Sequence, residues 1–305
     1  MNLNSRSLSQ AVESRREAEK YCRRLARDHY ENFTVVLPGI DRKRRQDLSN
    51  IYAFCRWADD LADEIADDAE AARQLDKFRR LLLATHEEQE HRKHPVFWAL
   101  AGTIERRDLS ERPFLDLISA FKQDLEKKRY EDFEELIDYC RRSANPVGRL
   151  VLAVFEQLNS KNIYYSDMTC SALQLTNFWA DVPIDLDKDR IYIPLEDLER
   201  FGLCPADLQD RQATRRFRRL LEFEIMRTRD WFRVGWKLAG RVDFPLSLAV
   251  ELFNAGGWSV LNKIENNSYD VFEKRWTIGK SEKFILGCRG IWRRIRGREG
   301  PPAPG

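Results

Sequence analysis

The sequence contains no apolar run long enough to cross a bilayer, and residues 1–20 lack the apolar core of a signal peptide. These absences predict a cytoplasmic protein. The six cysteines are scattered without CxxC spacing or neighbouring histidines, which argues against a zinc site or a disulfide framework. A G-x-G-x-x-G fingerprint is missing as well, although its absence alone does not exclude a nicotinamide cofactor.

Strand-like alternation is also missing. Apolar residues instead recur at spacings of three and four, in segments such as "YCRRLARDHYENF" and "PFLDLISAFKQDLEKK". With 305 residues, of which 43% are hydrophobic, the chain is able to bury a substantial core. The pattern predicts a single all-α domain of about ten helices, separated by breaks at prolines and glycines.

Positive and negative charges are nearly balanced along the whole chain. Lys and Arg number 52 and Asp and Glu number 50, so the net charge neither favours nor excludes nucleic acid, and we predict no nucleic-acid partner. The C-terminal stretch "FILGCRGIWRRIRGREG" mixes apolar residues with arginines. It predicts either peripheral contact with the inner face of an anionic membrane or an ordinary solvated last helix.

The stretch "FCRWADDLADEIADD", residues 54–68, places six acidic residues within ten positions. On one continuous helix, Asp59, Asp63 and Asp67 would lie on the same side. Each such pair of like charges costs roughly 0.2–0.5 kcal/mol unless something neutralises it. The stretch therefore indicates either a bound cation or a solvated surface.

A second acidic stretch, "LQLTNFWADVPIDLDKDRIYIP", begins at residue 173. Asn177, Asp181 and Asp185 again step by four, among apolar neighbours. Mg²⁺ takes oxygen ligands and is commonly held by one or two carboxylates together with substrate phosphates. Two facing carboxylate stripes therefore predict a diphosphate site in which Mg²⁺ neutralises the departing group. A single stripe on its own is more often a wet surface.

Four segments together resemble the squalene and phytoene synthase family of head-to-head prenyl transferases. They are "YAFCRWADDLADE", "YCRRSANPVG", "LQLTNFWADVPIDLDKDRIYIP" and "VLNKIENNSYDVFEKR". The resemblance implies an all-α isoprenoid-synthase helical bundle around a central cavity, with Mg²⁺ and prenyl diphosphate chemistry. It also implies a catalytic domain at residues 21–284, between an N-terminal extension at 1–20 and a basic C-terminal helix and tail at 285–305.

The resemblance assigns roles to individual positions. The implied metal ligands are Asp59, Asp60, Asp63, Asn177, Asp181 and Asp185. The implied diphosphate-binding residues are Arg56 and Arg275, whose forked guanidinium groups suit phosphate oxygens. The implied catalytic positions in the cavity are Tyr52, Asp124, Tyr139 and Gln174, and Gly148 matches the helix that carries Tyr139.

The sequence departs from the family pattern at three of these motif positions. Ala180 stands where many members have an arginine, which removes one phosphate contact. Trp258 occupies a position that is often tyrosine, so a cavity hydroxyl is absent. Pro183 deletes a helical hydrogen bond, so we expect a bend or an end of the helix there and regard Asp185 as the least secure metal ligand.

Several short motifs are most similar to those of the bacterial hydroxysqualene synthases, among them "HYENF", "QLTNFW" and "GGWSVLNKIE". The branch implies that presqualene diphosphate, supplied by a partner presqualene diphosphate synthase, loses its diphosphate and that water captures the rearranged cation. Phe54, Phe178, Trp179 and Trp258 are candidates to stabilise that cation by about 0.5–2 kcal/mol each. His29 and Tyr30 are candidates to hold the water, with a structural hydrogen bond as the alternative for His29.

Other interpretations stay open. Within the same fold, the chain could be a presqualene diphosphate, squalene or carotenoid-type synthase, with farnesyl diphosphate as a substrate. From another class, it could be a non-catalytic binding or assembly factor. Loss of the acidic motifs would mark that case, and both are present.

Overall fold

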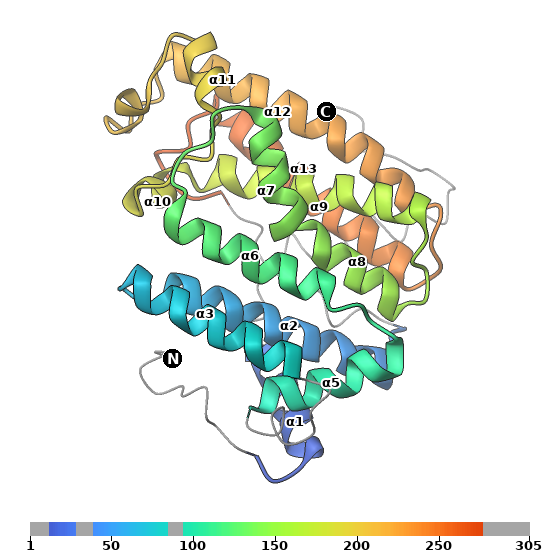
Figure 1. The fold of residues 1–305 in the computed structure, drawn as a ribbon. Helices are drawn as coiled ribbons and strands as arrows, with labels where there is room; N and C mark the ends of the chain where they lie inside the picture. Colours follow the sequence, from blue (N-terminus) through green and yellow to red (C-terminus); the bar gives the residue numbers. More distant parts are fainter. Residues whose placement is uncertain (1–11, 29–38, 85–93, 277–305) are drawn as a thin grey trace. The chain divides into compact units, whose positions relative to one another are not determined.

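The computed structural model describes residues 12–28, 39–84 and 94–276, and the regular elements within these ranges are helices (Figure 1). This confirms the predicted all-α class. The helices pack into two compact units. Of the described residues, unit 1 contains those up to Glu126 together with Arg149–Leu158, and unit 2 contains Lys127–Gly148 and those from Asn159 to residue 276. The predicted boundaries at residues 21 and 284 stay a prediction.

The helices of unit 1 are arranged around α2. Their bounds are α1 Arg15–Asp28, α2 Arg42–Asp63, α3 Asp68–Leu83, α5 Pro95–Arg107 and α6 Arg112–Glu126. Helix α2 contacts the other four, so it forms the centre of the unit (Figure 1). The first acidic stretch therefore lies at the C-terminal end of the most enclosed helix of unit 1.

Helix α2 is defined by a capped start and a long apolar face. The side chain of Asp41 caps it, accepting hydrogen bonds from the backbone N–H of Lys43 at 2.9 Å and of Arg44 at 3.0 Å. Fully buried Phe54 contacts Phe78 and Phe114, with ring centroids 5.0 Å apart in both pairs. Burial of each such side chain stabilises the fold by roughly 1.5–3 kcal/mol. Phe54 therefore has a packing role in this core.

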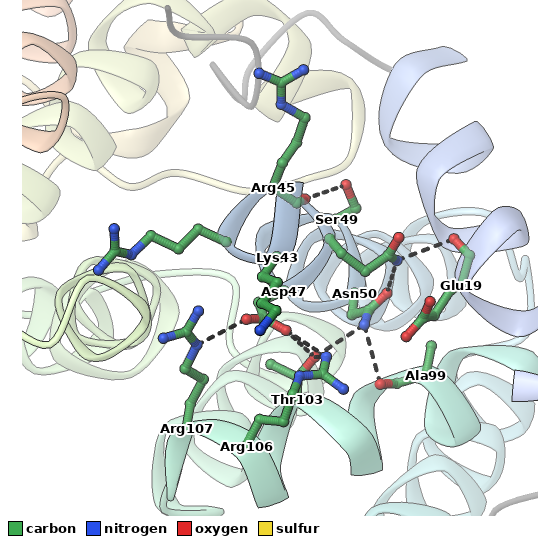
Figure 2. A network of polar contacts seen from close by, with 12 residues as sticks. Glu19, Lys43, Arg45, Asp47, Ser49, Asn50, Ala99, Thr103, Arg106 and Arg107 are labelled. Atoms are coloured by element: carbon green, nitrogen blue, oxygen red, sulfur yellow. Dashed lines mark hydrogen bonds and ion pairs between the residues drawn. The ribbon is translucent and has the colours of Figure 1, made fainter. Parts of the chain in front are cut away.

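A buried polar network fixes α2 against α5 (Figure 2). The fully buried carboxylate of Asp47 accepts hydrogen bonds from Arg106 at 2.6 Å, Arg107 at 2.9 Å and Thr103 at 3.1 Å. Asn50 donates to the carbonyl of Ala99 at 3.1 Å. Because removal of one partner from a buried ion pair typically costs about 3–5 kcal/mol, this network holds the two helices in one register.

Unit 2 is arranged around α9 in the same way. Its elements are α7 Phe133–Ser143, α9 Ser160–Ala180, α10 Val182–Asp187, α11 Leu195–Arg200, η3 Pro205–Leu208, α12 Arg215–Gly235, η4 Trp236–Leu238 and α13 Leu246–Asn266. Helix α8, Asn145–Val154, begins in unit 2 and continues into the segment assigned to unit 1. Helix α9 contacts α7, α10, α12 and α13, and the second acidic stretch lies at its C-terminal end (Figure 1).

Close packing of α9 on α12 depends on one glycine and one buried hydrogen bond. A Cβ on Gly235 would lie 2.4 Å from Oγ1 and 2.7 Å from the backbone N of Thr169, so only glycine allows this approach. The indole Nε1 of Trp179 donates to Oγ1 of Thr228 at 2.8 Å, and both residues are fully buried. These contacts fix the end of α9 from which the second acidic motif extends.

Within the described ranges, none of the helices has both the length and the apolar character that a bilayer-spanning segment needs.

Candidate functional site

The first acidic motif occupies the last two turns of α2. Asp59 is partly exposed, Asp60 is buried, and Asp63 is the last residue of the helix and is exposed. The prediction that Asp67 continues the same stripe is wrong. Helix α2 ends at Asp63, and Asp67 caps α3 by accepting a hydrogen bond from the backbone N–H of Ala69 at 3.0 Å.

Arg56 lies one turn before these carboxylates and is bound to them. Its Nη2 lies 2.5 Å from the carboxylate of Asp60, which is only 1% exposed, and its Nη1 lies 3.4 Å from that of Asp59. Burial by itself would lower the pKa of Arg56, but the charges of Asp60 and Asp59 outweigh it, and the net shift is upward. Arg56 is therefore a permanent cation at the predicted diphosphate position.

Tyr52 lies one turn before Arg56 on the same side of α2. Its side chain is buried, and burial, opposed by Arg56 and reinforced by Asp59 and Asp60, raises the pKa of its hydroxyl to about 12. Tyr52 therefore keeps its proton at neutral pH and remains a hydrogen-bond donor. Spacings of four, three and four along α2 bring Tyr52, Arg56, Asp59 and Asp63 to one side of the helix.

Asp124 belongs to the same unit. It is buried on α6, one of the helices that pack against α2. Its role in the cavity stays a prediction.

The second acidic motif lies across a helix break, as Pro183 predicts. Helix α9 ends at Ala180, Asp181 lies between the helices, and Pro183 is in the first turn of α10. Two backbone hydrogen bonds span the break: the N–H of Asp181 donates to the carbonyl of Asn177 at 2.8 Å, and that of Asp185 to the carbonyl of Asp181 at 2.9 Å. Each of the three predicted ligands is therefore linked to the next by one backbone hydrogen bond. Asn177 is exposed, and Asp181 and Asp185 are partly buried.

Arg275 and Asp181, predicted to bind diphosphate and metal respectively, form a bidentate ion pair in unit 2. Nε of Arg275 donates to Oδ1 at 2.7 Å, and Nη2 donates to Oδ2 at 2.8 Å. The arginine is 58% exposed and the carboxylate 20% exposed. In both units, a predicted metal ligand is thus paired with a predicted phosphate-binding arginine.

Four aromatic rings form a buried cluster that includes Phe178, the residue after Asn177. The rings of Phe178 and Tyr192 are stacked, with centroids 3.9 Å apart, and Tyr139 lies 6.0 Å from Phe178 and 5.9 Å from Tyr192. Tyr130 completes the cluster, 5.6 Å from Tyr192. The sequence motifs do not identify Tyr130 and Tyr192 as site candidates, although Tyr192 lies in the second acidic stretch.

The remaining candidates of unit 2 are placed as follows. Gln174 is partly buried on α9, one turn before Asn177. The motif "YCRRSANPVG" predicts that Tyr139 and Gly148 share one helix. This prediction is wrong, because α7 ends at Ser143 and α8 starts at Asn145. Trp258 is buried, and the guanidinium carbon of Arg229 lies 5.3 Å from its ring centroid.

Both acidic motifs lie at the C-terminal end of a helix, where negative charge is electrostatically unfavourable. The C-terminal end of a helix carries a partial negative charge, which favours cations there. Neither α2 nor α9 has a basic residue in its last turn, although three aspartates lie in the last two turns of α2 and Asp181 is the C-cap of α9. Arg56 and Arg275 offset part of the negative potential at these two ends, and a bound cation would offset the rest.

The donor chemistry of the two motifs fits Mg²⁺. Carboxylate and amide oxygens are suitable ligands, and Mg²⁺ keeps water or takes substrate phosphates at its other positions. Within the described part of each unit, no three acidic, histidine or cysteine side chains form a metal site by themselves. These residues are able to supply one or two carboxylates to each ion, with phosphate oxygens completing the coordination of the metal.

The two motifs belong to different units, so the prediction that they face each other stays a prediction. His29, Tyr30 and the basic C-terminal segment lie outside the described residues.

The family model for squalene/phytoene synthase matches residues 26–282. The chain therefore belongs to the squalene/phytoene synthase family, whose members carry out head-to-head prenyl transfer on prenyl diphosphates.

Curated relatives and solved structures resemble the chain over most of its length. A phytoene synthase of Arthrospira platensis is 31% identical over 86% of this chain and 88% of its own, and a 15-cis-phytoene synthase of Synechocystis is 32% identical over 88% and 83%. The crystal structure of squalene synthase HpnC from Alicyclobacillus acidocaldarius matches with 38% identity and a TM-score of 0.78, covering 87% of this chain and 99% of that one. A dehydrosqualene synthase structure, at 23% identity and a TM-score of 0.83, shares the fold.

Proposed function

We propose that this protein converts presqualene diphosphate to hydroxysqualene by ionisation, rearrangement and capture by water. The observation that carries the proposal is the 38% identity to a bacterial squalene synthase over 87% of the chain, against 31–32% for the phytoene synthases. The motifs "QLTNFW" and "GGWSVLNKIE" favour the same branch.

The diphosphate would be held by the paired arginines and carboxylates. Mg²⁺, when bound to carboxylates such as Asp59 and Asp181, neutralises the negative charge that develops on the departing diphosphate. In the structure, Arg56 is paired with Asp60, and Arg275 with Asp181. With these carboxylates as the residues that would hold Mg²⁺, the two guanidinium groups would be the ones to bind phosphate oxygens bidentately.

The hydrocarbon part of the substrate requires a cavity whose side chains do not react with a carbocation. In the proposed reaction, the carbon–oxygen bond breaks with its electron pair on diphosphate, the cation rearranges, and water adds to carbon and loses one proton. The stacked rings of Phe178 and Tyr192 offer π-faces that stabilise positive charge. The protonated hydroxyl of Tyr52 is neutral and therefore a much weaker nucleophile toward the cation than a phenolate would be.

A second candidate is synthesis of a phytoene-type product. It is favoured by the names of the curated relatives, which are phytoene synthases. Presqualene diphosphate synthase and reductive squalene synthase activities belong to the same fold and remain outcomes of the test below. The presence of both acidic motifs argues against a non-catalytic binding or assembly factor.

Product analysis separates these functions. The purified protein is incubated with Mg²⁺ and presqualene diphosphate, and separately with farnesyl diphosphate, each with and without NADPH. We expect hydroxysqualene from presqualene diphosphate without NADPH. Squalene that forms only with NADPH would show a reductive enzyme, and phytoene or dehydrosqualene would show the carotenoid branch. No turnover of any prenyl diphosphate would favour the binding factor.

The proposal includes two associations. A presqualene diphosphate synthase would supply the substrate, and residues 285–305, through their arginines, would contact the inner face of an anionic membrane close to the apolar product.

A further inference from the structure

Helix α2 carries its charges in the reverse of the favourable order. The N-terminal end of a helix favours acidic residues, yet the first four residues of α2 are Arg42, Lys43, Arg44 and Arg45, and its first turn has no acidic residue. Asp41 compensates in part as the N-cap and as a partner of Arg44. The acidic end of α2 is explained by the candidate site, whereas the basic end has no part in that site.

Two of these four residues have a structural role. Arg44 also pairs with Glu156 at 3.9 Å, and Arg45 donates to the carbonyl of Ile40 at 3.2 Å. Arg42 and Lys43 are exposed, and no described residue forms an ion pair or hydrogen bond with their side chains. The buried acidic residue closest in sequence, Asp47, is already bound by Arg106 and Arg107.

Helix α1 presents a basic stripe of its own. Its apolar side, which includes Ala18, Cys22, Leu25 and Ala26, is buried against α2 and α5. The opposite side carries exposed basic residues at helical spacing. They are Arg16, Lys20, Arg23, Arg24 and Arg27. Because its apolar side is covered by α2 and α5, α1 has only this basic side to offer, and clustered basic residues are attracted to the negative surface of an anionic membrane.

The two basic groups are continuous. Arg23 of α1 donates to the side chain of Gln46 of α2, and Gln46 donates to the carbonyl of Glu19 at 3.1 Å. Arg42 and Lys43 precede Gln46 by four and three residues, so they lie on its side of α2, next to α1. Over residues 12–28 and 41–46, ten basic residues face five acidic ones, although the whole chain is nearly neutral.

From this arrangement we propose that the outer side of α1 and the first turn of α2, together called the basic face, dock the protein on an anionic phospholipid membrane. The choice of a membrane over other polyanions rests on the proposed function, because its substrate and product are C30 lipids that partition into a bilayer. Arg42 is about 26 Å along α2 from Asp59, at 1.5 Å per residue, so docking leaves the acidic end of the helix uncovered.

Vesicle sedimentation of the full chain without substrate tests this proposal, so its result does not depend on which reaction the enzyme catalyses. The variant replaces Arg16, Lys20, Arg42 and Lys43 with glutamine. The matched control replaces two arginines and two lysines of unit 2 that are also exposed. They are Lys161, Arg215, Arg219 and Lys237. Both proteins lose four positive charges, and none of the eight positions belongs to the candidate site.

We expect the wild type and the control to bind phosphatidylcholine vesicles that contain phosphatidylglycerol, and not pure phosphatidylcholine vesicles. Each basic residue near an anionic membrane contributes roughly fivefold, so the basic-face variant should bind at least about tenfold more weakly. High salt should weaken wild-type binding as well. Equal binding by the variant and the control would overturn the proposal. So would binding of RNA by the basic face in the absence of vesicle binding.

Discussion

Replacing Thr228 with valine tests whether the contact between α9 and α12 positions the second acidic motif. Thr228 Oγ1 accepts a hydrogen bond from Nε1 of Trp179 at 2.8 Å and donates to the carbonyl of Glu224 at 2.8 Å. Valine keeps the shape, so it opens no cavity, but it leaves the buried indole N–H without its partner. A buried donor left unsatisfied costs about 1–3 kcal/mol. Because Trp179 lies between Asn177 and Asp181, loss of this hydrogen bond acts directly on the second acidic motif.

We expect the Thr228→Val variant to have a lower free energy of unfolding by about 1–3 kcal/mol, measured by denaturant titration. We also expect it to need a severalfold higher Mg²⁺ concentration for half-maximal turnover. Thr228→Ser retains the hydroxyl and should restore the Mg²⁺ requirement. A variant with reduced stability but an unchanged Mg²⁺ requirement would refute the positioning argument, since the hydrogen bond would then only stabilise the fold. Unchanged stability would refute the assigned hydrogen bond.

Three further predictions concern the metal ligands, a buried acid and the C-terminal segment. Asp59→Ala and Asp181→Ala should each reduce turnover at least ~100-fold with unchanged far-ultraviolet circular dichroism, and near-normal Mg²⁺-dependent activity would contradict the metal assignment. Burial, opposed by Arg227 and reinforced by Asp197, raises the pKa of the Glu224 carboxyl from 4.5 to about 8. The folded state therefore favours the protonated form of this side chain. The stability that the protonated form contributes is lost as pH rises through about 8. The melting temperature of the wild type should therefore fall more than that of Glu224→Gln between about pH 6 and about pH 9, and parallel curves would contradict the shift. Removal of residues 284–305 should weaken binding to anionic vesicles while activity on detergent-dispersed substrate persists, and unchanged sedimentation would reject a membrane role for that segment.

The sequence was sufficient to predict the helical class and the two acidic motifs, because both depend on local patterns. Apolar periodicity reports helices directly, and Pro183 correctly marks a break that the structure places at Asp181. The extension of the first stripe to Asp67 failed for a local reason as well. An aspartate that begins a new helix and one that continues the old helix look alike in a repeat of four, and only the cap hydrogen bond to Ala69 distinguishes them.

Contacts between distant segments were not predictable in this way. Tyr130 and Tyr192 come together because two non-helical segments run side by side, with the backbone N–H of Ile191 donating to the carbonyl of Lys128 at 2.9 Å and that of Leu195 to Tyr130 at 2.9 Å. No periodic pattern connects residues that are about sixty positions apart. The pairing of Arg275 with Asp181 is of the same kind. The sequence predicts diphosphate binding for Arg275 and metal binding for Asp181, and only the structure shows that the two side chains are paired.

The most direct test of the central proposal follows the oxygen atom of the product. The purified enzyme is supplied with presqualene diphosphate and Mg²⁺ in water enriched in the heavy isotope of oxygen, without NADPH, and the product is analysed by mass spectrometry. If water captures the rearranged cation, hydroxysqualene should carry heavy oxygen in the same proportion as the solvent. Hydroxysqualene with unlabelled oxygen, or the absence of hydroxysqualene under these conditions, would contradict the proposal.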